Sequence, residues 1–451
     1  MSKKYTVRCK SLLPSGEGLI NFNHSDFSVK GVLPKEKCNI ELIYKKDRTD
    51  ARVTDILEPS PDRVQVKCPV YDKCGGCNLL HMSYDAELKF KEDKIRELYK
   101  DFDVTVLPII KSPVPEHYRN KVYASFGFKK INGKIRQIAG MYEENTREVV
   151  NSADCLIQNK TANDIIKTIV AIMNETGTRS YDPKTKTGTI RHVYIRVSKE
   201  SGKVMLVIVT GEPEFKLKNV FVKKLTEKYP CIETIVHNIN TKNTGMILGE
   251  RNIVLFGKGY ITDEIMKCKF NISPKSFYQV NPVQTEKLYE TALRFAGLSG
   301  VESVIDAYSG IGTISIAAAK HAKKVFGVEL NRDAINDAKE NAKLNGSTNV
   351  EFINSDAGEF LKNNELKINP DLIFMDPPRS GSDEKFLSAV CTAAPKKIVY
   401  ISCNPETQVR DVKYLTENGY ELKKIQPVDM FSRVGHVEAC ALLVKASGSD
   451  A

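Results

Sequence analysis

The stretch Leu372-Ile373-Phe374-Met375-Asp376-Pro377-Pro378-Arg379 joins a short apolar run to an acidic, proline-rich turn. A second stretch of the same design follows about one strand–helix unit later, Ile398-Val399-Tyr400-Ile401-Ser402-Cys403-Asn404-Pro405. Each apolar run is typical of a buried parallel strand, so an acid and a thiol stand at the carboxyl ends of two strands. Open α/β sheets bind ligands at those ends. We therefore expect a doubly wound sheet with Asp376 and Cys403 in its active site.

The pattern from residue 271 onward alternates between strand and helix. Asn281-Pro282 predicts the start of a helix and Gly297 its end. Further strands are expected at 303–308, 325–329, 350–353, 371–375, 397–402 and 438–444, with helices at 313–321 and 332–345. Residues 271–451 thus predict a Rossmann-like, mostly parallel α/β domain.

Two more domains are expected before this one, since 451 residues exceed a single hydrophobic core. Residues 1–58 contain five short strand-like runs separated by turn residues, the pattern of a small OB-like barrel. Pro59-Ser60-Pro61 interrupts this pattern. Residues 59–270 mix strand-like runs with helical patterns at 84–99 and 162–174, which indicates an α+β domain.

The composition narrows the class of protein. The formal net charge is +11, which fits either simple solubility or a polyanionic partner, and charge alone leaves both open. No apolar run approaches the roughly 20 residues that span a bilayer, and the first residues have no apolar signal-peptide core. We expect a cytoplasmic protein without a membrane partner. The sequence does not indicate an obligate protein partner.

A nucleotide-like cofactor is indicated by the turn after the first strand of the C-terminal pattern. Gly310 and Gly312 allow a tight turn close to a ligand, but Ser315 replaces the third glycine of a dinucleotide motif. Glu329 and Asp356 follow the next two strands, where acids suit ribose hydroxyls and an adenine amino group. Together they favour S-adenosylmethionine. The alternative is an ordinary turn beside solvated acids.

Apart from Cys403, the eleven cysteines divide into two groups. Cys68, Cys74 and Cys77 have metal-ligand spacing, and with the distant Cys155 they supply four thiolates. Tetrahedral zinc, a [4Fe–4S] cluster and four unligated thiols remain open. Six others are expected to be small core residues: Cys9, Cys38, Cys231, Cys268, Cys391 and Cys440.

Four motifs together resemble the signatures of the RNA (uracil-5-)-methyltransferases. They are Asp376-Pro377-Pro378-Arg379, Ile401-Ser402-Cys403-Asn404-Pro405, Gly435-His436-Val437-Glu438 and Ser273-Pro274-Lys275-Ser276-Phe277-Tyr278-Gln279-Val280-Asn281. The likeness extends over almost the whole chain, because residues 1–58 resemble a TRAM domain and the cysteine loop resembles that family's cluster loop. It implies a class I methyltransferase domain and a [4Fe–4S] cluster. It also implies the branch acting on large-subunit (23S) rRNA, since the tRNA branch usually lacks the TRAM domain and the cluster.

The resemblance assigns roles to single residues. Cys403 is implied as the nucleophile that adds to C6 of uracil, and Glu438 as the base that removes the C5 proton. Phe277 and Tyr278 are candidates to stack on a flipped base, although such a pair is more often core. The residues implied to contact or lie beside S-adenosylmethionine are Gln279, Tyr308, Thr313, Glu329, Asp356 and Asp376.

Two alternatives to methylation of large-subunit rRNA remain. The first is the same reaction on tRNA. The second is an inactive methyltransferase fold that serves as an iron–sulfur RNA-binding protein, and the intact Cys403 and Glu438 argue against it.

Overall fold

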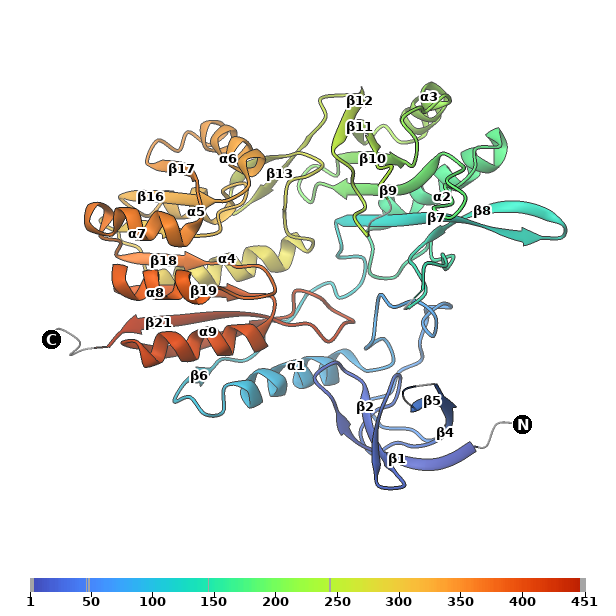
Figure 1. Ribbon diagram of the computed structural model, residues 1–451, viewed down its shortest axis with the longest axis horizontal. Coiled ribbons are helices and arrows are strands. Elements are labelled where there is room, and N and C mark those ends of the chain that lie inside the picture. Colours follow the sequence, from blue (N-terminus) through green and yellow to red (C-terminus); the bar gives the residue numbers. More distant parts are fainter. Residues whose placement is uncertain (1–3, 46, 48, 145, 243–244, 447–451) are drawn as a thin grey trace.

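The computed structural model describes residues 4–446 apart from 46, 48, 145 and 243–244 (Figure 1). Its N-terminal part is a five-stranded antiparallel sheet in the order β3-β2-β1-β4-β5. The strands are β1 (Lys4–Leu12), β2 (Gly18–Phe22), β3 (Ser25–Val29), β4 (Lys37–Tyr44) and β5 (Thr49–Glu58). The outer strands β3 and β5 contact each other, so the sheet curls around a small apolar core. The prediction of an OB-like barrel is confirmed.

The central part is a six-stranded sheet in the order β12-β11-β10-β9-β7-β8. Its strands are β7 (Lys121–Ile131), β8 (Lys134–Gly140), β9 (Ile190–Val197), β10 (Val204–Thr210), β11 (Ile232–Ile239) and β12 (Arg251–Phe256). Helices α2 (Lys160–Thr176) and α3 (Lys218–Lys228) pack on one face. The other face shares a hydrophobic core with the C-terminal part, because side chains of β10 alternate between the two faces. The two parts therefore form one continuous body.

The C-terminal part is an eight-stranded sheet in the order β17-β16-β15-β18-β19-β21-β20-β6. Its strands are β6 (Thr105–Val106), β15 (Ser303–Asp306), β16 (Lys324–Glu329), β17 (Val350–Asn354), β18 (Leu372–Met375), β19 (Lys397–Ser402), β20 (Tyr420–Val428) and β21 (Glu438–Lys445). The strands from β17 to β19 run parallel, whereas β21 is antiparallel to both of its neighbours. The mostly parallel sheet is as expected.

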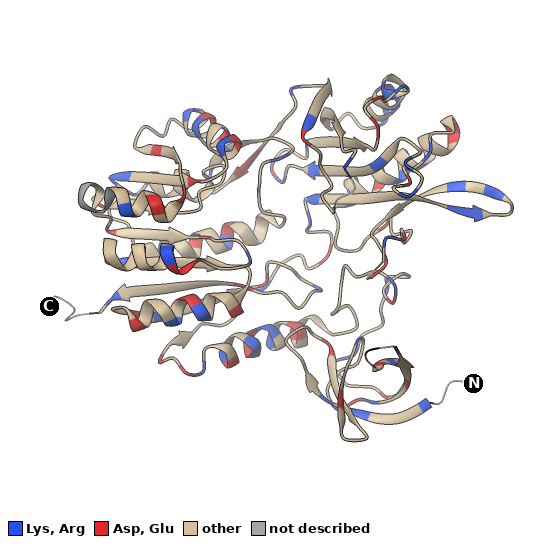
Figure 2. Cartoon of the chain, in the orientation of Figure 1, with Lys and Arg blue, Asp and Glu red and all other residues tan. Residues whose placement is uncertain are grey.

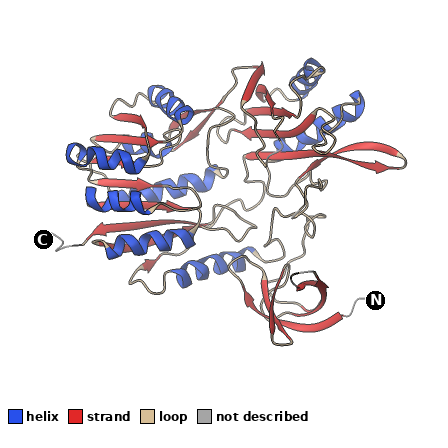
Figure 3. Ribbon diagram, in the orientation of Figure 1, coloured by secondary structure: helices blue, strands red, loops and turns tan. Residues whose placement is uncertain are grey.

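Helices cover both faces of this sheet, which gives three layers (Figure 3). One face packs against α4 (Pro282–Ala296), α5 (Thr313–Ala319) and α6 (Arg332–Leu344). The other face packs against α1 (Tyr84–Leu98), α7 (Ala357–Ile368), α8 (Glu384–Ala393) and α9 (Pro405–Glu417). Helix α4 begins and ends as predicted, because the Asn281 side chain caps it and Gly297 adopts the left-handed conformation.

Two segments outside residues 271–451 pack on the C-terminal part. The short strand β6 pairs with β20, and α1 packs against α9 and β20. The hairpin of β13 (Ile261–Ile265) and β14 (Cys268–Ile272) contacts α4, α5 and α6. Residues that the sequence placed at 59–270 are thus attached to the C-terminal sheet, and the three domain boundaries remain a prediction. Among the described residues, no helix combines the length and apolar character of a membrane span.

Candidate active site

The carboxyl edge of the C-terminal sheet brings three predicted residues together. Asp376 follows β18 and Cys403 follows β19, and these parallel strands are hydrogen-bonded neighbours. Strand β21 runs the opposite way, so its first residue, Glu438, lies at the same edge. In that ladder Ser402 pairs with Ala439, so Cys403, directly after β19, and Glu438, at the start of β21, are the next residues along two adjacent strands. The topology thus unites an acid, a thiol and a second acid.

The two proline-rich turns are tied directly to each other. The Asn404 side-chain amide and the Thr407 hydroxyl donate hydrogen bonds to the Arg379 carbonyl at 3.0 and 3.2 Å. The Arg410 guanidinium donates to the carbonyl of Ser380 at 3.0 Å. These contacts fix the turn after Asp376 against the turn that carries Cys403.

Cys403 is half-buried in the turn between β19 and α9. It immediately precedes Asn404, the N-cap of α9, where the helix amides favour a negatively charged sulfur. Burial raises the pKa of its thiol to about 11, and the negative charges of Glu438 and Asp376 add to this, while Arg379 opposes it. In the free protein at neutral pH, Cys403 is therefore a thiol that needs help to ionise.

Glu438 has a solvent exposure of only 2%. Burial raises the pKa of its carboxyl to about 8, with a further contribution from Asp376 and opposition from Arg379. Its Oε2 atom has no hydrogen-bond partner within the described part of the chain. A buried carboxyl near neutrality is suited to accept and release a proton at the active site.

A pocket lies between the β15–α5 turn, the segment before α4 and the end of β18. Four of the predicted cofactor residues line it, namely Gln279, Tyr308, Thr313 and Asp376. The Thr313 hydroxyl lies 3.3 Å from the hydroxyl of Tyr289, which also lines the pocket. Burial raises the pKa of Asp376 to about 7, and the nearby Asp306 raises it further. The pocket thus combines aromatic walls with one carboxyl.

The β15–α5 turn is shaped by glycine and by a buried carboxyl. Gly312 has a φ of 87°, and a Cβ atom there would lie 2.6 Å from the Phe352 ring. The Ser315 hydroxyl donates a hydrogen bond to Asp306 at 2.6 Å, which gives the serine at the third-glycine position a structural role. Burial raises the pKa of Asp306 to about 6. Sequence reasoning assigned no role to Asp306, although an acid at the end of a buried strand was a readable signal.

Glu329 and Asp356 do not line the pocket described above. Glu329 accepts hydrogen bonds from the backbone N–H groups of Gly310 at 3.2 Å and Asn331 at 2.8 Å. Asp356 caps α7 by accepting two backbone N–H groups at 2.9 and 3.0 Å. Both carboxylates therefore accept backbone hydrogen bonds at the ends of neighbouring strands. Their contacts with a cofactor remain a prediction.

The aromatic pair before α4 divides between core and surface. Tyr278 is 1% exposed and packs near Phe270 and Arg196, so it cannot stack on a base. Phe277 is 62% exposed at the rim of the pocket. The stacking prediction is therefore wrong for Tyr278 and stands for Phe277 alone.

A groove of about 810 Å³ connects the N-terminal barrel to Cys403. Its lining includes Ser15 of the barrel, Cys77 of the cysteine loop and Arg119. Arg379 and His436 line it beside Cys403, and neither was assigned a role from the sequence, although both lie within the motifs. Burial lowers the pKa of His436, as do nearby cations that include Arg379, so this ring is neutral at neutral pH.

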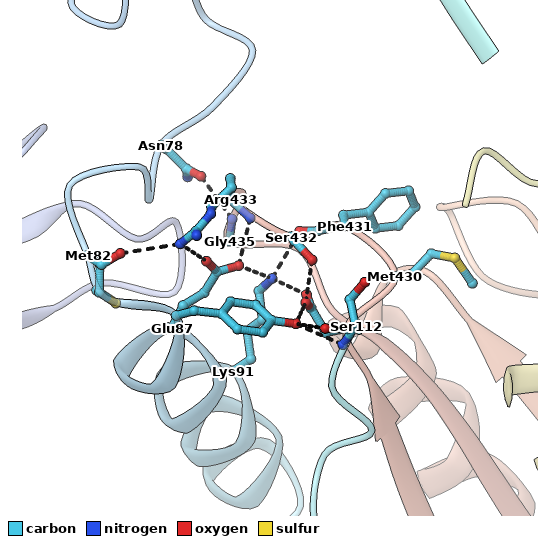
Figure 4. A network of polar contacts seen from close by, with 12 residues as sticks. Asn78, Met82, Glu87, Lys91, Ser112, Met430, Phe431, Ser432, Arg433 and Gly435 are labelled. Atoms are coloured by element: carbon cyan, nitrogen blue, oxygen red, sulfur yellow. Dashed lines mark hydrogen bonds and ion pairs between the residues drawn. The ribbon is translucent and has the colours of Figure 1, made fainter. Parts of the chain in front are cut away.

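The wall formed by residues 431–437 is held by a buried polar network (Figure 4). The Lys91 ammonium donates to Glu87 at 2.7 Å and to Asp429 at 2.5 Å. The backbone N–H of Arg433 donates to Glu87 at 2.7 Å, and that of Gly435 to Asn78 at 2.9 Å. Helix α1 and the cysteine loop therefore position the segment that leads into Glu438.

One cavity of about 100 Å³ is lined by all four predicted metal ligands, Cys68, Cys74, Cys77 and Cys155. Arg119 also lines this cavity. Burial raises the pKa of Cys77, and the other three sulfurs raise it further, so the four thiols are close enough to interact electrostatically. Among the described residues, no group of three or more His, Cys, Asp or Glu side chains is arranged to hold a metal ion. Of the other six cysteines, Cys231 and Cys391 are half-buried rather than core residues.

Comparisons with known proteins agree with this architecture. The family model described as tRNA (uracil-5-)-methyltransferase matches residues 83–446. An uncharacterized RNA methyltransferase of Halalkalibacterium halodurans is 40% identical over 443 residues, covering 97% of this chain and 96% of that protein. One of Clostridium acetobutylicum is 41% identical over 436 residues, covering 95% and 94%. The Pyrococcus abyssi tRNA (uracil-54, C5)-methyltransferase, solved with S-adenosyl-L-homocysteine, has a TM-score of 0.77 at 26% identity and covers 98% of this chain and 100% of its own.

Proposed function

Since this chain belongs to the RNA (uracil-5-)-methyltransferase family and is an RNA methyltransferase, we propose that it methylates C5 of a uridine through a covalent bond between Cys403 and C6. The observation that carries the proposal is that Cys403 directly follows β19 and Glu438 begins the adjacent strand β21, at the same edge of the sheet. A nucleophile and a base must reach the same pyrimidine ring, and this pairing meets that need.

The chemistry requires two events at neighbouring ring carbons. The Cys403 thiolate forms a bond to C6, and the electron pair of the C5–C6 double bond then makes C5 nucleophilic. When bound, S-adenosylmethionine would supply an electrophilic methyl group to C5 and would leave as S-adenosyl-L-homocysteine, with the electron pair of the broken S–CH3 bond on sulfur. Glu438 then removes the C5 proton, the double bond re-forms, and the C6–S bond breaks with the electron pair returning to sulfur. Arg379 favours the thiolate at the first and last steps.

The pocket lined by Gln279, Tyr308, Thr313 and Asp376 is proposed to hold S-adenosylmethionine. The presence of S-adenosyl-L-homocysteine in the Pyrococcus abyssi enzyme supports a cofactor of this class. Glu329 and Asp356 are proposed to flank the nucleoside end, because they follow the next two strands of the same edge.

The groove between the barrel and Cys403 is proposed to hold the RNA around the target. The target uridine must leave its stack to reach the thiol, which costs least in a loop or bulge. Residues 1–58 are proposed to act as a TRAM-type RNA-binding barrel, consistent with the net charge of +11. An RNA substrate would place the enzyme in the cytoplasm.

The substrate is proposed to be large-subunit 23S rRNA, with tRNA as the competing substrate. The Pyrococcus abyssi tRNA enzyme covers 98% of this chain, so an N-terminal barrel by itself does not exclude tRNA. The test is to map 5-methyluridine in rRNA and tRNA from cells with and without this protein. A uridine in 23S rRNA that loses its methyl group supports the proposal, a tRNA uridine supports the alternative, and no change in either contradicts both.

The four cysteines are proposed to hold a [4Fe–4S] cluster. A cluster takes one thiolate on each iron, whereas zinc needs all four sulfurs around one point. Four thiols that line one cavity supply the number of thiolate ligands that such a cluster needs. Iron and acid-labile sulfide are expected in protein purified without oxygen, and Cys77→Ser should lose both. A stoichiometric zinc content instead would overturn this assignment.

A further inference from the structure

A second pocket of about 790 Å³ opens beside the active site, between the central sheet and the segment before α4. It shares Tyr123 with the RNA groove and Phe277 with the proposed cofactor pocket. It therefore adjoins both halves of the active site, yet the methylation chemistry assigns it no role.

The pocket contains a half-buried cation without a carboxylate partner. The Lys121 ammonium lies 5.8 Å from the ring centroid of Tyr194 and 6.0 Å from that of Phe277. Within the described residues it has no hydrogen bond or ion pair to an acid. Burial lowers its pKa to about 8, helped by the nearby Arg196 and Arg119, so it stays mostly charged at pH 7. Such a site favours an incoming anion.

The walls of the pocket suit a nucleobase and a phosphate together. Phe277 is 62% exposed, and Tyr123 is half-buried, so both offer ring surface for stacking. Lys275 adds an exposed positive charge, while Lys242 is already paired with Glu250 at 2.6 Å. Charge and aromatic surface are thus complementary to a single-stranded nucleotide.

We propose that this pocket binds an unpaired nucleotide that flanks the target uridine, with its base against Phe277 and Tyr123 and its phosphate toward Lys121 and Lys275. The inference rests on the proposed RNA substrate. Once the target leaves its stack, its neighbour loses a stacking partner, and the pocket would replace that contact.

The test uses a fluorescent single-stranded oligouridylate of about 12 nucleotides, a length within the range of single-strand sites, without methyl donor. Lys121→Met is expected to weaken binding roughly tenfold and to lower the salt slope by about one. Lys129→Met is the matched control, because Lys129 is exposed on the same strand near the β7–β8 turn and does not line the pocket. Figure 2 shows Lys and Arg positions along this projecting hairpin. The control should change affinity less than about twofold, and Lys121→Arg should retain most binding.

A measurement on the unmodified protein guards against misfolding of the variant. A 4-thiouridine-containing oligonucleotide of the same length should cross-link to peptides that contain Tyr123 or Phe277. Equal affinities of Lys121→Met and Lys129→Met, or cross-links absent from both peptides, would overturn the subsite even if uridine methylation persists. Failure of the wild-type protein to form 5-methyluridine, with Lys121-dependent binding intact, would instead refute the methylation proposal and support the subsite.

Discussion

The ammonium group of Lys91 lies 2.5 Å from the carboxylate of Asp429, 338 positions away in the chain, and both side chains are fully buried. Lys91 belongs to α1 (Figure 4). Asp429 follows β20 and precedes the groove wall. The Tyr84 hydroxyl donates to the same carboxylate at 2.6 Å. The pair thus joins the helix that precedes the central sheet to the segment that ends at Glu438.

Lys91→Met should destabilise the protein by about 3–5 kcal/mol, because the carboxylates of Glu87 and Asp429 would lose their buried partner. Lys89→Met is the control, since Lys89 is exposed on the same helix and should cost less than about 0.5 kcal/mol. Urea denaturation followed by circular dichroism gives both values. Equal unfolding midpoints for the two variants would contradict a structural role for the pair.

Cys403→Ala should abolish methylation and the covalent complex with 5-fluorouridine-containing RNA, because the bond to C6 cannot form. Cys391→Ala is the matched control, since Cys391 is a half-buried cysteine on α8. It should retain both activities. The complex is detected as a band of retarded mobility in a denaturing gel. A covalent complex formed by Cys403→Ala would exclude this sulfur as the nucleophile.

Glu438→Gln should trap the RNA on the enzyme after methyl transfer, because the C5 proton has no base to accept it. The expected result is a methylated covalent complex in single-turnover reactions with ordinary uridine, together with at least about a hundredfold loss of released product. Mass spectrometry of the complex identifies the added methyl group. Release of 5-methyluridine at the wild-type rate would rule out Glu438 as the base.

The rate should rise with pH, because two groups must lose protons. Burial places the pKa of Glu438 at about 8 and that of Cys403 at about 11. The logarithm of the rate of covalent complex formation should therefore climb with a slope near one, because it depends on Cys403, whereas release of 5-methyluridine from the complex should rise up to about pH 8 and then level off, because it depends on Glu438. In Glu438→Gln, complex formation should keep its slope, and the break near pH 8 in product release should disappear. A bell-shaped profile with a maximum below pH 7 would contradict these assignments.

Arg379→Met should slow alkylation of Cys403 by iodoacetamide several-fold at pH 8, since the guanidinium opposes the rise in the thiol pKa. Arg379→Lys should retain part of the rate because the charge remains. Arg136→Met, which removes an exposed charge from the β7–β8 hairpin, is the control. Peptide mass spectrometry separates Cys403 from the other cysteines. An alkylation rate unaffected by Arg379→Met would show that the charge does not act on the sulfur.

Strong local signals made much of the C-terminal fold predictable. Apolar runs identified β15 to β19, and capping residues identified α4. The same reasoning found no strand at β20 and no helix at α7, α8 or α9. In β20, the sequence Tyr-Glu-Leu-Lys-Lys-Ile-Gln-Pro-Val mixes lysines with a proline, which weakens a strand signal. Strand β6 has only two residues and owes its existence to the open edge of β20.

The candidate site divides in the same way. Strand-end position alone placed Asp376 and Cys403, because parallel strands deliver their next residues to one edge. Glu438 followed only from the resemblance to a family, since a residue at the start of a strand has no local mark of catalysis. The sequence did not predict the ion pair of Lys91 and Asp429. Lysines in a highly charged helix are usually exposed to solvent, so nothing in the local sequence distinguishes a buried one.

By itself, the sequence determined which residue types end each strand, how tightly the β15–α5 turn can bend, and which cysteines have metal-ligand spacing. Those properties depend on neighbours along the chain. Only the tertiary structure decided that Glu438 lies beside the turn that carries Cys403, because β21 enters the sheet antiparallel between β19 and β20. It also decided that Lys121 lies among aromatic rings and Lys91 among acids, because burial and charge pairing depend on segments far apart in the chain.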